Sequence, residues 1–334
     1  MAGSGKAHMR PDGDRILEVN DLTVEFNLGR GKVVKAVSGI SLDLIRGETL
    51  AIVGESGCGK STLGKAILQL PKPTSGSVNF LSKELTTMNK HDLREMRPAM
   101  QMIFQDPISS LDPRLPVSEV LAEPLRVWNR GNEVEINEKI DELLRAANLD
   151  PAVVRDRRSY EFSGGQCQRI SIARALALDP TMIICDEPVS ALDVSVQAQV
   201  VNLLEDLKKE FGLTLIFIAH DLAVVKNISD RIAVMYLGKI VETAPAAELF
   251  KEPSHPYTRA LLSAVPEPDR RERRDRIILE GDVPSPLNPP SGCSFHPRCR
   301  ESAAACSATT PSLINLDPAG SRRVSCLRRG PDAI

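Results

Sequence analysis

Short apolar runs alternate with longer helical patterns along most of this chain. The runs at 50–54, 181–188 and 213–220 are continuous, which predicts buried strands. Residues 16–24 and 39–45 roughly alternate apolar and polar positions, the pattern of half-buried strands. Helical spacing is found at 61–70, 117–128, 135–147, 163–178 and 194–211. Strands that alternate with helices predict an α/β fold with a largely parallel sheet.

The pattern changes towards the C-terminus. Residues 231–244 are typical of a hairpin with its turn near Gly238. Beyond Phe250 the chain is rich in turn residues, and nine of its 24 prolines fall between Pro253 and Pro297. We therefore expect three parts: a polar tail at 1–15, a main domain at 16–250 and a small loop-rich extension at 251–334.

Composition excludes several classes of protein. Hydrophobic residues make up 42% and charged residues 26%, which allows a sizeable core and rules out disorder throughout. A net charge of −2 and only 4% aromatic residues argue against a nucleic-acid-binding surface. No apolar run approaches the roughly 18 residues that span a bilayer, and the N-terminus lacks the apolar core of a signal peptide. We expect any membrane role to depend on partners.

Residues 54–61, GESGCGKS, match the phosphate-binding pattern G-x-x-x-x-G-K-[ST]. The glycines let successive backbone N–H groups point into one concavity, where they cradle phosphate oxygens. Lys60 supplies a positive charge for the β- and γ-phosphates, and the Ser61 hydroxyl is placed to bind Mg²⁺. The following helix directs the positive end of its dipole at the same anion. The predicted strand before the motif and helix after it are the context that the motif requires.

A strand that ends in two carboxylates, MIICDE at 182–187, predicts a second part of this site. Asp186 can hold Mg²⁺ through the water shell of the ion, because this hard cation keeps its waters. Glu187 can orient or deprotonate an attacking water. A strand ending in Asp-Glu is common by itself, so the hypothesis depends on the phosphate-binding loop upstream.

The stretch FSGGQCQR at 162–169 predicts another anion site. Ser163, Gly164 and Gly165 lie at the expected N-terminus of a helix, where backbone N–H groups are available. A simple Ser N-cap with flexible glycines explains the local pattern equally well. One nucleotide does not need two glycine-rich sites, so we interpret the second as serving a nucleotide held by another subunit.

These motifs, in this order and spacing, resemble those of the ATP-binding subunits of ABC transporters. The resemblance covers roughly residues 16–250 and implies a P-loop NTPase cassette, with a RecA-like core, an antiparallel β subdomain and a helical subdomain at about 106–165. It identifies 54–61 as the Walker A motif and 163–166 as the signature motif, and it implies ATP and Mg²⁺ as cofactors. The ATP-binding residues that it implies are Gly54, Ser56, Gly57, Cys58, Gly59, Lys60, Ser61 and Thr62.

The same resemblance assigns roles to further single residues. Gln105, in MIFQDP, is similar to the Q-loop glutamine, which senses the γ-phosphate and Mg²⁺ beside the docking groove for the membrane subunit. His220 is similar to the switch histidine, and SALD at 190–193 is similar to the D-loop at the dimer interface, through Ser190 and Asp193. The implied catalytic residues are Glu187, His220 and Gln105; the magnesium ligands Ser61, Gln105 and Asp186; and the contacts to the partner's ATP Ser163, Gly164, Gly165 and Gln166.

Two positions depart from the family pattern. The family usually stacks adenine on an aromatic residue shortly before the strand at 39–45, and the stretch 31–34 has none. Phe26 has a poor offset for this role, which leaves an aliphatic contact through Val33 open. Cys167 follows SGGQ where Gln, Arg or Lys is common, and we expect little loss because that residue faces away from phosphate in the family.

Four cysteines crowd into the loop-rich extension: Cys293, Cys299, Cys306 and Cys326, spaced C-x5-C-x6-C-x19-C. In a chain without an export signal, such thiols suit a metal better than disulfides. Zinc usually takes closer pairs, whereas a Cys₄-bound [4Fe–4S] cluster accepts wider spacing. From the spacing alone zinc, iron–sulfur and unpaired buried thiols all stay open.

The resemblance favours the cluster. HPYT at 255–258 and PSPLNPPSGCSFHPRC at 284–299 are similar to the C-terminal extension of the dipeptide and oligopeptide importer ATPases, and most similar to their F-type subunits in dipeptide permeases. Members of this group carry a [4Fe–4S] cluster in this extension, which implies Cys293, Cys299, Cys306 and Cys326 as ligands. We expect a structural rather than redox-sensing role, with Pro256 and Tyr257 packing the extension against the cassette.

The resemblance implies an ATPase that drives import of dipeptides or oligopeptides. Its implied partners are a second cassette of the D-type, two membrane permease subunits and a periplasmic or lipid-anchored binding protein, with no nucleic acid. Its implied location is the cytoplasmic face of the bacterial inner membrane. Competing hypotheses are an ABC ATPase of iron–sulfur assembly, a nucleic-acid-associated ABC protein, and an importer of another solute such as glutathione or a metallophore.

Overall fold

The computed structural model describes residues 14–29, 31–265 and 275–330. The chain divides into two compact units: unit 1 comprises Met1–Met88 and Ala219–Ile334, and unit 2 comprises Asn89–Ile218. Unit 1 therefore holds the phosphate-binding loop together with the C-terminal extension. The predicted polar tail at 1–15 lies almost entirely outside the described residues. The predicted boundaries at 250 and at 106–165 stay predictions.

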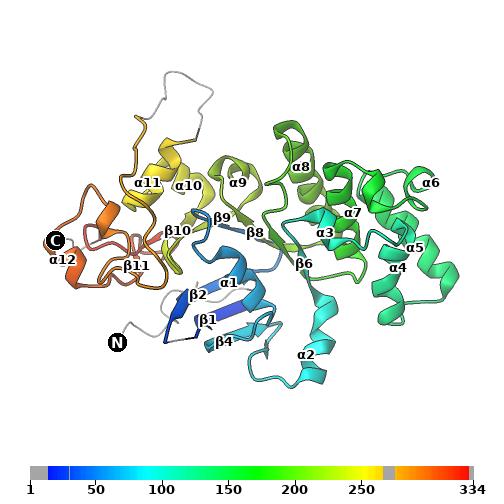
Figure 1. Ribbon diagram of the computed structural model, residues 1–334, viewed down its shortest axis with the longest axis horizontal. Coiled ribbons are helices and arrows are strands. Elements are labelled where there is room, and N and C mark those ends of the chain that lie inside the picture. Colours follow the sequence, from blue (N-terminus) through cyan, green and yellow to red (C-terminus); the bar gives the residue numbers. More distant parts are fainter. Residues whose placement is uncertain (1–13, 30, 266–274, 331–334) are drawn as a thin grey trace. The chain divides into compact units, whose positions relative to one another are not determined.

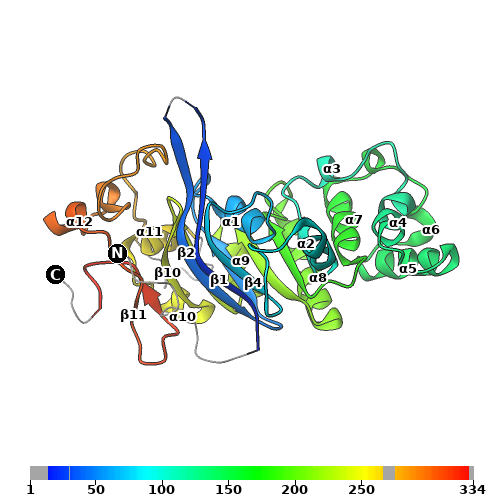
Figure 2. The same ribbon diagram turned by 90° about the horizontal axis from the view of Figure 1, so that it is seen from below.

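Unit 1 contains an antiparallel sheet of the order β2-β1-β4-β5. Its long strands β1 (Arg15–Asn27) and β2 (Val33–Ile45) pair along most of their length, as Figure 2 shows. They confirm the two alternating patterns, and the apolar positions of β1 from Leu17 to Val24 are buried. Strand β4 (Ser75–Phe80) pairs with the other edge of β1 and leads into β5 (Lys83–Glu84). We did not predict β4, because SGSVNF has only two apolar residues.

A second group of strands in unit 1 leads into the phosphate-binding loop and joins the extension to the core. Strand β3 (Thr49–Val53) pairs in parallel with β9 (Arg231–Tyr236), which forms the predicted hairpin with β10 (Lys239–Pro245). The turn of this hairpin includes Gly238 at φ 76°. Two short strands of the extension, β12 (Arg323–Val324) and β11 (Ile314–Asn315), continue the pairing from β10.

The helices of unit 1 are short. Helix α1 (Lys60–Ile67) follows β3 and ends earlier than the predicted 70, because Gln69 has left-handed backbone dihedrals. The helices that follow in the sequence are α9 (Leu222–Ile228), α10 (Ala246–Lys251), α11 (Pro256–Ser263) and α12 (Ala304–Ala308), all visible in Figure 1. A 3₁₀ turn, η5 (His296–Arg298), lies between two of the extension cysteines.

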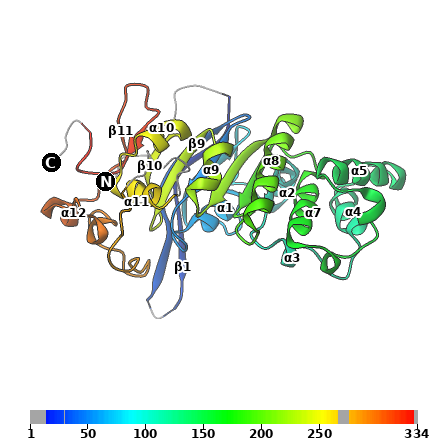
Figure 3. The ribbon, with the colours of Figure 1, turned by 90° about the horizontal axis from the view of Figure 1, so that it is seen from above.

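Unit 2 combines a parallel sheet with a group of helices. Its strands are β6 (Met100–Ile103), β7 (Met182–Asp186) and β8 (Thr214–Ala219, of which all but Ala219 belong to unit 2), with β7 in the middle. The predicted helices are confirmed within about two residues as α4 (Val117–Val127), α5 (Glu133–Ala146), α7 (Gly164–Leu176) and α8 (Val194–Phe211). Helices α4, α5 and α7 contact one another, as Figure 3 shows. The pattern missed β6, α2 (Lys90–Met96), α3 (Pro107–Ser110) and α6 (Pro151–Val154), all seven residues or shorter.

No helix in the described ranges is both long and apolar enough to cross a bilayer. Helix α8, the longest described, has 18 residues. Its C-terminal half carries the charged residues Glu205, Asp206, Lys208 and Lys209. This half of the helix is therefore suited to contact with water.

Candidate active site

The predicted phosphate-binding loop connects a buried strand to a helix N-terminus. Strand β3 ends at Val53, and α1 begins at Lys60 after Gly59, whose φ is 104°. A side chain at Gly59 would collide with the carbonyl oxygen of Ala36, and one at Gly54 with that of Met235. Glycine is therefore required at both positions, because other residues would be too bulky or, at Gly59, also strained.

The Lys60 side chain is hydrogen-bonded to the first residues of the phosphate-binding loop. Its Nζ donates hydrogen bonds to the carbonyl oxygens of Gly54 at 2.8 Å and Glu55 at 3.1 Å, and the residue is buried. Ser61 follows in the first turn of α1, where the helix dipole favours a bound anion. Burial raises the pKa of the neighbouring Cys58 thiol, so this cysteine stays protonated at neutral pH.

The carboxylates of the strand-end motif lie in unit 2. Asp186 is the last residue of β7 and is buried, and Glu187 follows it with φ 46°. A positive φ is strained for a residue with a side chain, and such strain is concentrated at functional sites. The backbone N–H of Glu187 is held by the carbonyl oxygen of Ile218 at 3.0 Å. Gln105 Nε2 donates to Glu187 Oε2 at 3.0 Å, so two of the three predicted catalytic residues are in direct contact.

The predicted signature motif forms the N-terminus of α7. The backbone N–H of Gln166 donates to Ser163 Oγ at 3.4 Å, and Gln166 Oε1 accepts from the backbone N–H of Ser163 at 3.0 Å. This reciprocal cap is the Ser N-cap that also explained the sequence pattern. It leaves Ser163 exposed at the positive end of the helix. A Cβ at Gly165 would lie 2.6 Å from Val196 Cγ1 of α8, so glycine permits close packing there.

The remaining predicted residues lie at element ends. Ser190 Oγ donates to the carbonyl oxygen of Glu187 at 3.1 Å, and Asp193 is the exposed residue before α8. His220 is exposed directly after β8. The structure thus groups the predicted residues in two sets: the phosphate-binding loop and His220 in unit 1, and the carboxylates, Gln105 and the signature in unit 2.

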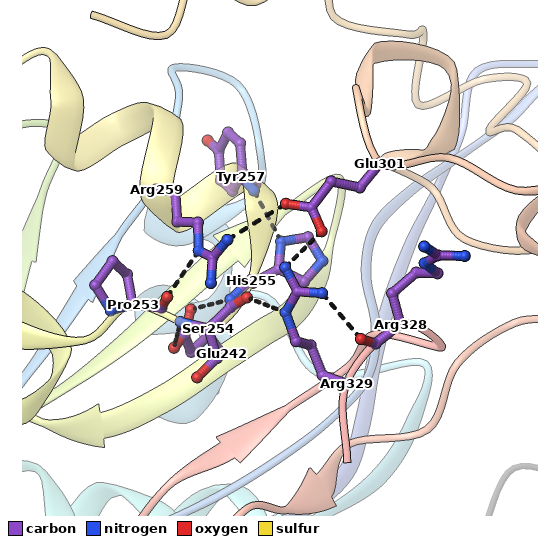
Figure 4. A network of polar contacts seen from close by, with 9 residues as sticks. All are labelled: Glu242, Pro253, Ser254, His255, Tyr257, Arg259, Glu301, Arg328 and Arg329. Carbon is purple, nitrogen blue, oxygen red and sulfur yellow. Dashed lines mark hydrogen bonds and ion pairs between the residues drawn. The ribbon is translucent and has the colours of Figure 1, made fainter. Parts of the chain in front are cut away.

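Residues around the HPYT segment connect the extension to strand β10 of unit 1. Glu242 of β10 accepts hydrogen bonds from the backbone N–H groups of Ser254 and His255, at 2.7 and 2.9 Å. Figure 4 shows that Arg329 donates to the carbonyl oxygen of Ser254 and also pairs with Glu301. This partly buried polar network holds the start of α11 on β10.

Comparison with known proteins identifies the family. Residues 37–190 match the family described as ABC transporter, and residues 241–306 match the oligopeptide/dipeptide transporter, C-terminal region. The chain is 52% identical to the oligopeptide transport ATP-binding protein OppF of Escherichia coli strain K12, over 95% of this chain and 97% of that protein. The chain belongs to the oligopeptide-transport branch of the ABC ATP-binding proteins. It is also 50% identical to the putative oligopeptide transport ATP-binding protein YkfD of Bacillus subtilis strain 168, over 93% of this chain and 94% of that protein.

A solved structure supports the cassette fold. The ATP-binding cassette MJ0796, solved as a dimer in a post-hydrolysis state bound to ADP and phosphate, is 30% identical to this chain. It has a TM-score of 0.63 and covers 69% of this chain and 98% of the solved chain. The likeness confirms the predicted P-loop ABC ATPase cassette, and the chain is accordingly an ABC ATPase.

The four cysteines of this ABC protein's extension lie near one another without forming disulfides. The backbone N–H of Cys293 donates to the carbonyl oxygen of Cys306 at 2.8 Å. Burial raises the pKa of Cys293, Cys299 and Cys326, to about 11 for Cys299, and repulsion between neighbouring thiolates adds to the shift. Within the described residues, no group of three or more His, Cys, Asp or Glu side chains is arranged to hold a metal ion.

Proposed function

We propose that this chain is the ATP-hydrolysing subunit of an importer of oligopeptides or dipeptides, acting as one of a pair of cassettes. The observation that carries the proposal is the combination of an ABC transporter match at 37–190 with an oligopeptide/dipeptide transporter match at 241–306. The relatives named above are oligopeptide transport proteins and are matched over nearly their whole length.

In this proposal, different residues bind the phosphates, hold Mg²⁺ and activate the attacking water. The phosphate-binding loop and Lys60 hold the β- and γ-phosphates, and Ser61, Asp186 and Gln105 are the residues that would hold Mg²⁺. When bound, this ion offsets negative charge on the phosphate oxygens. Glu187 orients the attacking water and accepts its proton, with its carboxylate positioned by Gln105.

His220 and the signature complete the proposed catalytic set. His220 contacts the γ-phosphate, and the exposed N-terminus of α7 binds the nucleotide of the partner cassette. Because one chain has one phosphate-binding loop and one signature, a pair of chains makes two composite sites. We propose a D-type paralogue as the second cassette, and a pair of permease subunits with an external binding protein at the cytoplasmic face of the inner membrane.

The extension argues against the competing functions. An ATPase of iron–sulfur assembly does not account for the oligopeptide/dipeptide region at 241–306. Purification of the tagged full chain from membranes should recover two polytopic membrane proteins and a second cassette. Deletion of the gene that encodes the chain should abolish uptake of a labelled tripeptide. A stable complex with assembly scaffold proteins or RNA, with normal tripeptide uptake after deletion, would contradict the importer.

We also propose that the four extension cysteines hold an iron–sulfur centre. The donor set suits it, because Cys293, Cys299 and Cys326 have raised pKa values and repel one another as thiolates, so a cationic centre is needed to keep them deprotonated together. A bound centre would supply a crosslink within the extension.

Visible absorption of the purified protein tests for the iron–sulfur centre. The chain purified without oxygen should be brown, with absorption at roughly 400 nm, and Cys293→Ser or Cys299→Ser should bleach it. Cys185→Ala, which removes a buried thiol of β7 outside the extension, is the matched control and should keep the colour. Colourless protein containing zinc would refute the iron–sulfur assignment.

A further inference from the structure

The second residue of the phosphate-binding loop carries a negative charge beside the proposed anion site. Glu55 follows Gly54 directly after β3, and its side chain is 25% exposed. Like charges repel strongly where protein excludes much of the water. A carboxylate at this position would weaken phosphate binding unless a cation offsets its charge.

Arg298 of the extension supplies that cation. Its Nη1 lies 2.8 Å from Glu55 Oε2 and its Nη2 lies 3.2 Å from Glu55 Oε1, a bidentate pair. The Arg298 side chain is only 8% exposed. Two parallel hydrogen bonds fix both the charge and the orientation of the carboxylate.

The main chain of Glu55 is held as well. Its backbone N–H donates to Tyr257 Oη at 2.9 Å, and its carbonyl oxygen accepts from Lys60 Nζ at 3.1 Å. Residue 55 is therefore held by the extension on one side and by the phosphate-binding lysine on the other. A displacement of Glu55 would also displace a hydrogen-bond partner of Lys60.

A rigid aromatic cluster supports both contacts. Tyr236, Tyr257 and Phe295 are buried, with ring centroids 4.8 Å apart for the tyrosine pair and 5.3 Å from each tyrosine to Phe295. Aromatic edge contacts of this kind restrict side-chain motion in a core. Phe295 precedes η5, the turn that contains Arg298, so the cluster determines where Arg298 lies.

We propose that Arg298 and Tyr257 are positioning residues of the ATP site, through which the C-terminal extension neutralises and orients Glu55 for nucleotide binding. The inference rests on the proposed binding of ATP by residues 54–61. It assigns the extension a direct part in the nucleotide site, in addition to packing.

The test measures binding of a fluorescent ADP analogue to the full chain by anisotropy. Arg298→Met leaves the Glu55 carboxylate unpaired and should weaken binding about tenfold, as a loss of ~1.4 kcal/mol would. The deficit should shrink with added salt, because salt screens the repulsion. The double variant Glu55→Gln with Arg298→Met removes the charge and should recover most of the affinity.

Two further variants separate positioning from folding. Arg259→Met breaks another Arg–Glu pair of the extension, with Glu301, and should bind the analogue like wild type. Tyr257→Phe keeps the ring but removes the acceptor, so amide hydrogen exchange at Glu55 should accelerate and affinity should fall a few-fold. In the assembled transporter, Arg298→Met should raise the KM for ATP and leave kcat unchanged.

Wild-type affinity in Arg298→Met would overturn the inference, as would a double variant that binds no better than Arg298→Met. In both cases the proposed ATPase function would stand. A wild-type chain that fails to bind the analogue would overturn the inference and the ATP site together.

Discussion

Glu187 is held in place through both its backbone and its side chain. Its positive φ is disfavoured by sterics, and the hydrogen bond from its N–H to Ile218 holds it there. Gln105 then contacts its carboxylate from a position 82 residues away in the sequence. Both supports are what the proposed role requires, because a carboxylate that orients a water must itself be held in place.

Replacement of Glu187 tests this role. Glu187→Gln should lower the ATPase rate by about 10²–10⁴-fold, the usual contribution of a general base, and leave ATP binding intact. Steady-state phosphate release and binding of labelled ATP are the two measurements. Glu210→Gln, an exposed carboxylate of α8, is the matched control and should turn over normally. An unchanged rate in Glu187→Gln would remove Glu187 from the role of base.

At the scale of elements, helix α11 begins on a buried histidine. The Nδ1 atom of His255 accepts the backbone N–H of Tyr257 at 3.1 Å, which caps the helix. Burial, together with the positive charge of Arg329, lowers the pKa of His255 to about 3. The ring is therefore neutral in the folded protein, and a proton on Nδ1 would remove the cap.

This cap makes stability depend on pH. In the unfolded chain the histidine pKa is about 6.5, so between about pH 6.5 and pH 3 the unfolded state binds more protons and stability falls as the pH falls. At pH 5 the loss is about 2 kcal/mol. Asparagine is also a good N-cap and does not titrate, so His255→Asn should lose less thermal stability between pH 7.5 and pH 5.

The difference between wild type and His255→Asn gives the contribution of His255 to the pH dependence of stability. Burial raises the pKa of nearby Glu242, which has the opposite effect on the pH dependence, but this carboxylate is present in both. Melting temperatures at pH 7.5 and 5 provide the measurement. An equal decrease in wild type and His255→Asn would show that His255 does not cause the acid sensitivity.

At the scale of the whole molecule, the two proposed anion sites of the chain belong to different compact units. The phosphate-binding loop is in unit 1, and the exposed N-terminus of α7 is in unit 2. A cassette that works in pairs should use the first site for its own nucleotide and the second for the nucleotide of its partner.

Concentration dependence tests the pairing. The ATPase rate per chain should rise with protein concentration or on addition of a second cassette. Ser163→Arg should abolish turnover and still bind the ADP analogue as a single chain, because in the proposed pair the signature contacts the nucleotide of the partner. A rate per chain that is independent of concentration and of any partner, or full turnover in Ser163→Arg, would contradict the paired mechanism.

The residue pattern alone predicted most of the longer strands and helices and the phosphate-binding loop, because these depend on local periodicity and on glycine spacing. It also placed Tyr257 as a packing residue through its HPYT motif. The contact between Gln105 and Glu187, and the pairing of Arg298 with Glu55 across 243 residues, were found only in the folded structure. Hydrophobic patterns predict which side chains are buried. The partner of a charged or amide group depends instead on which distant loops the folded core brings together.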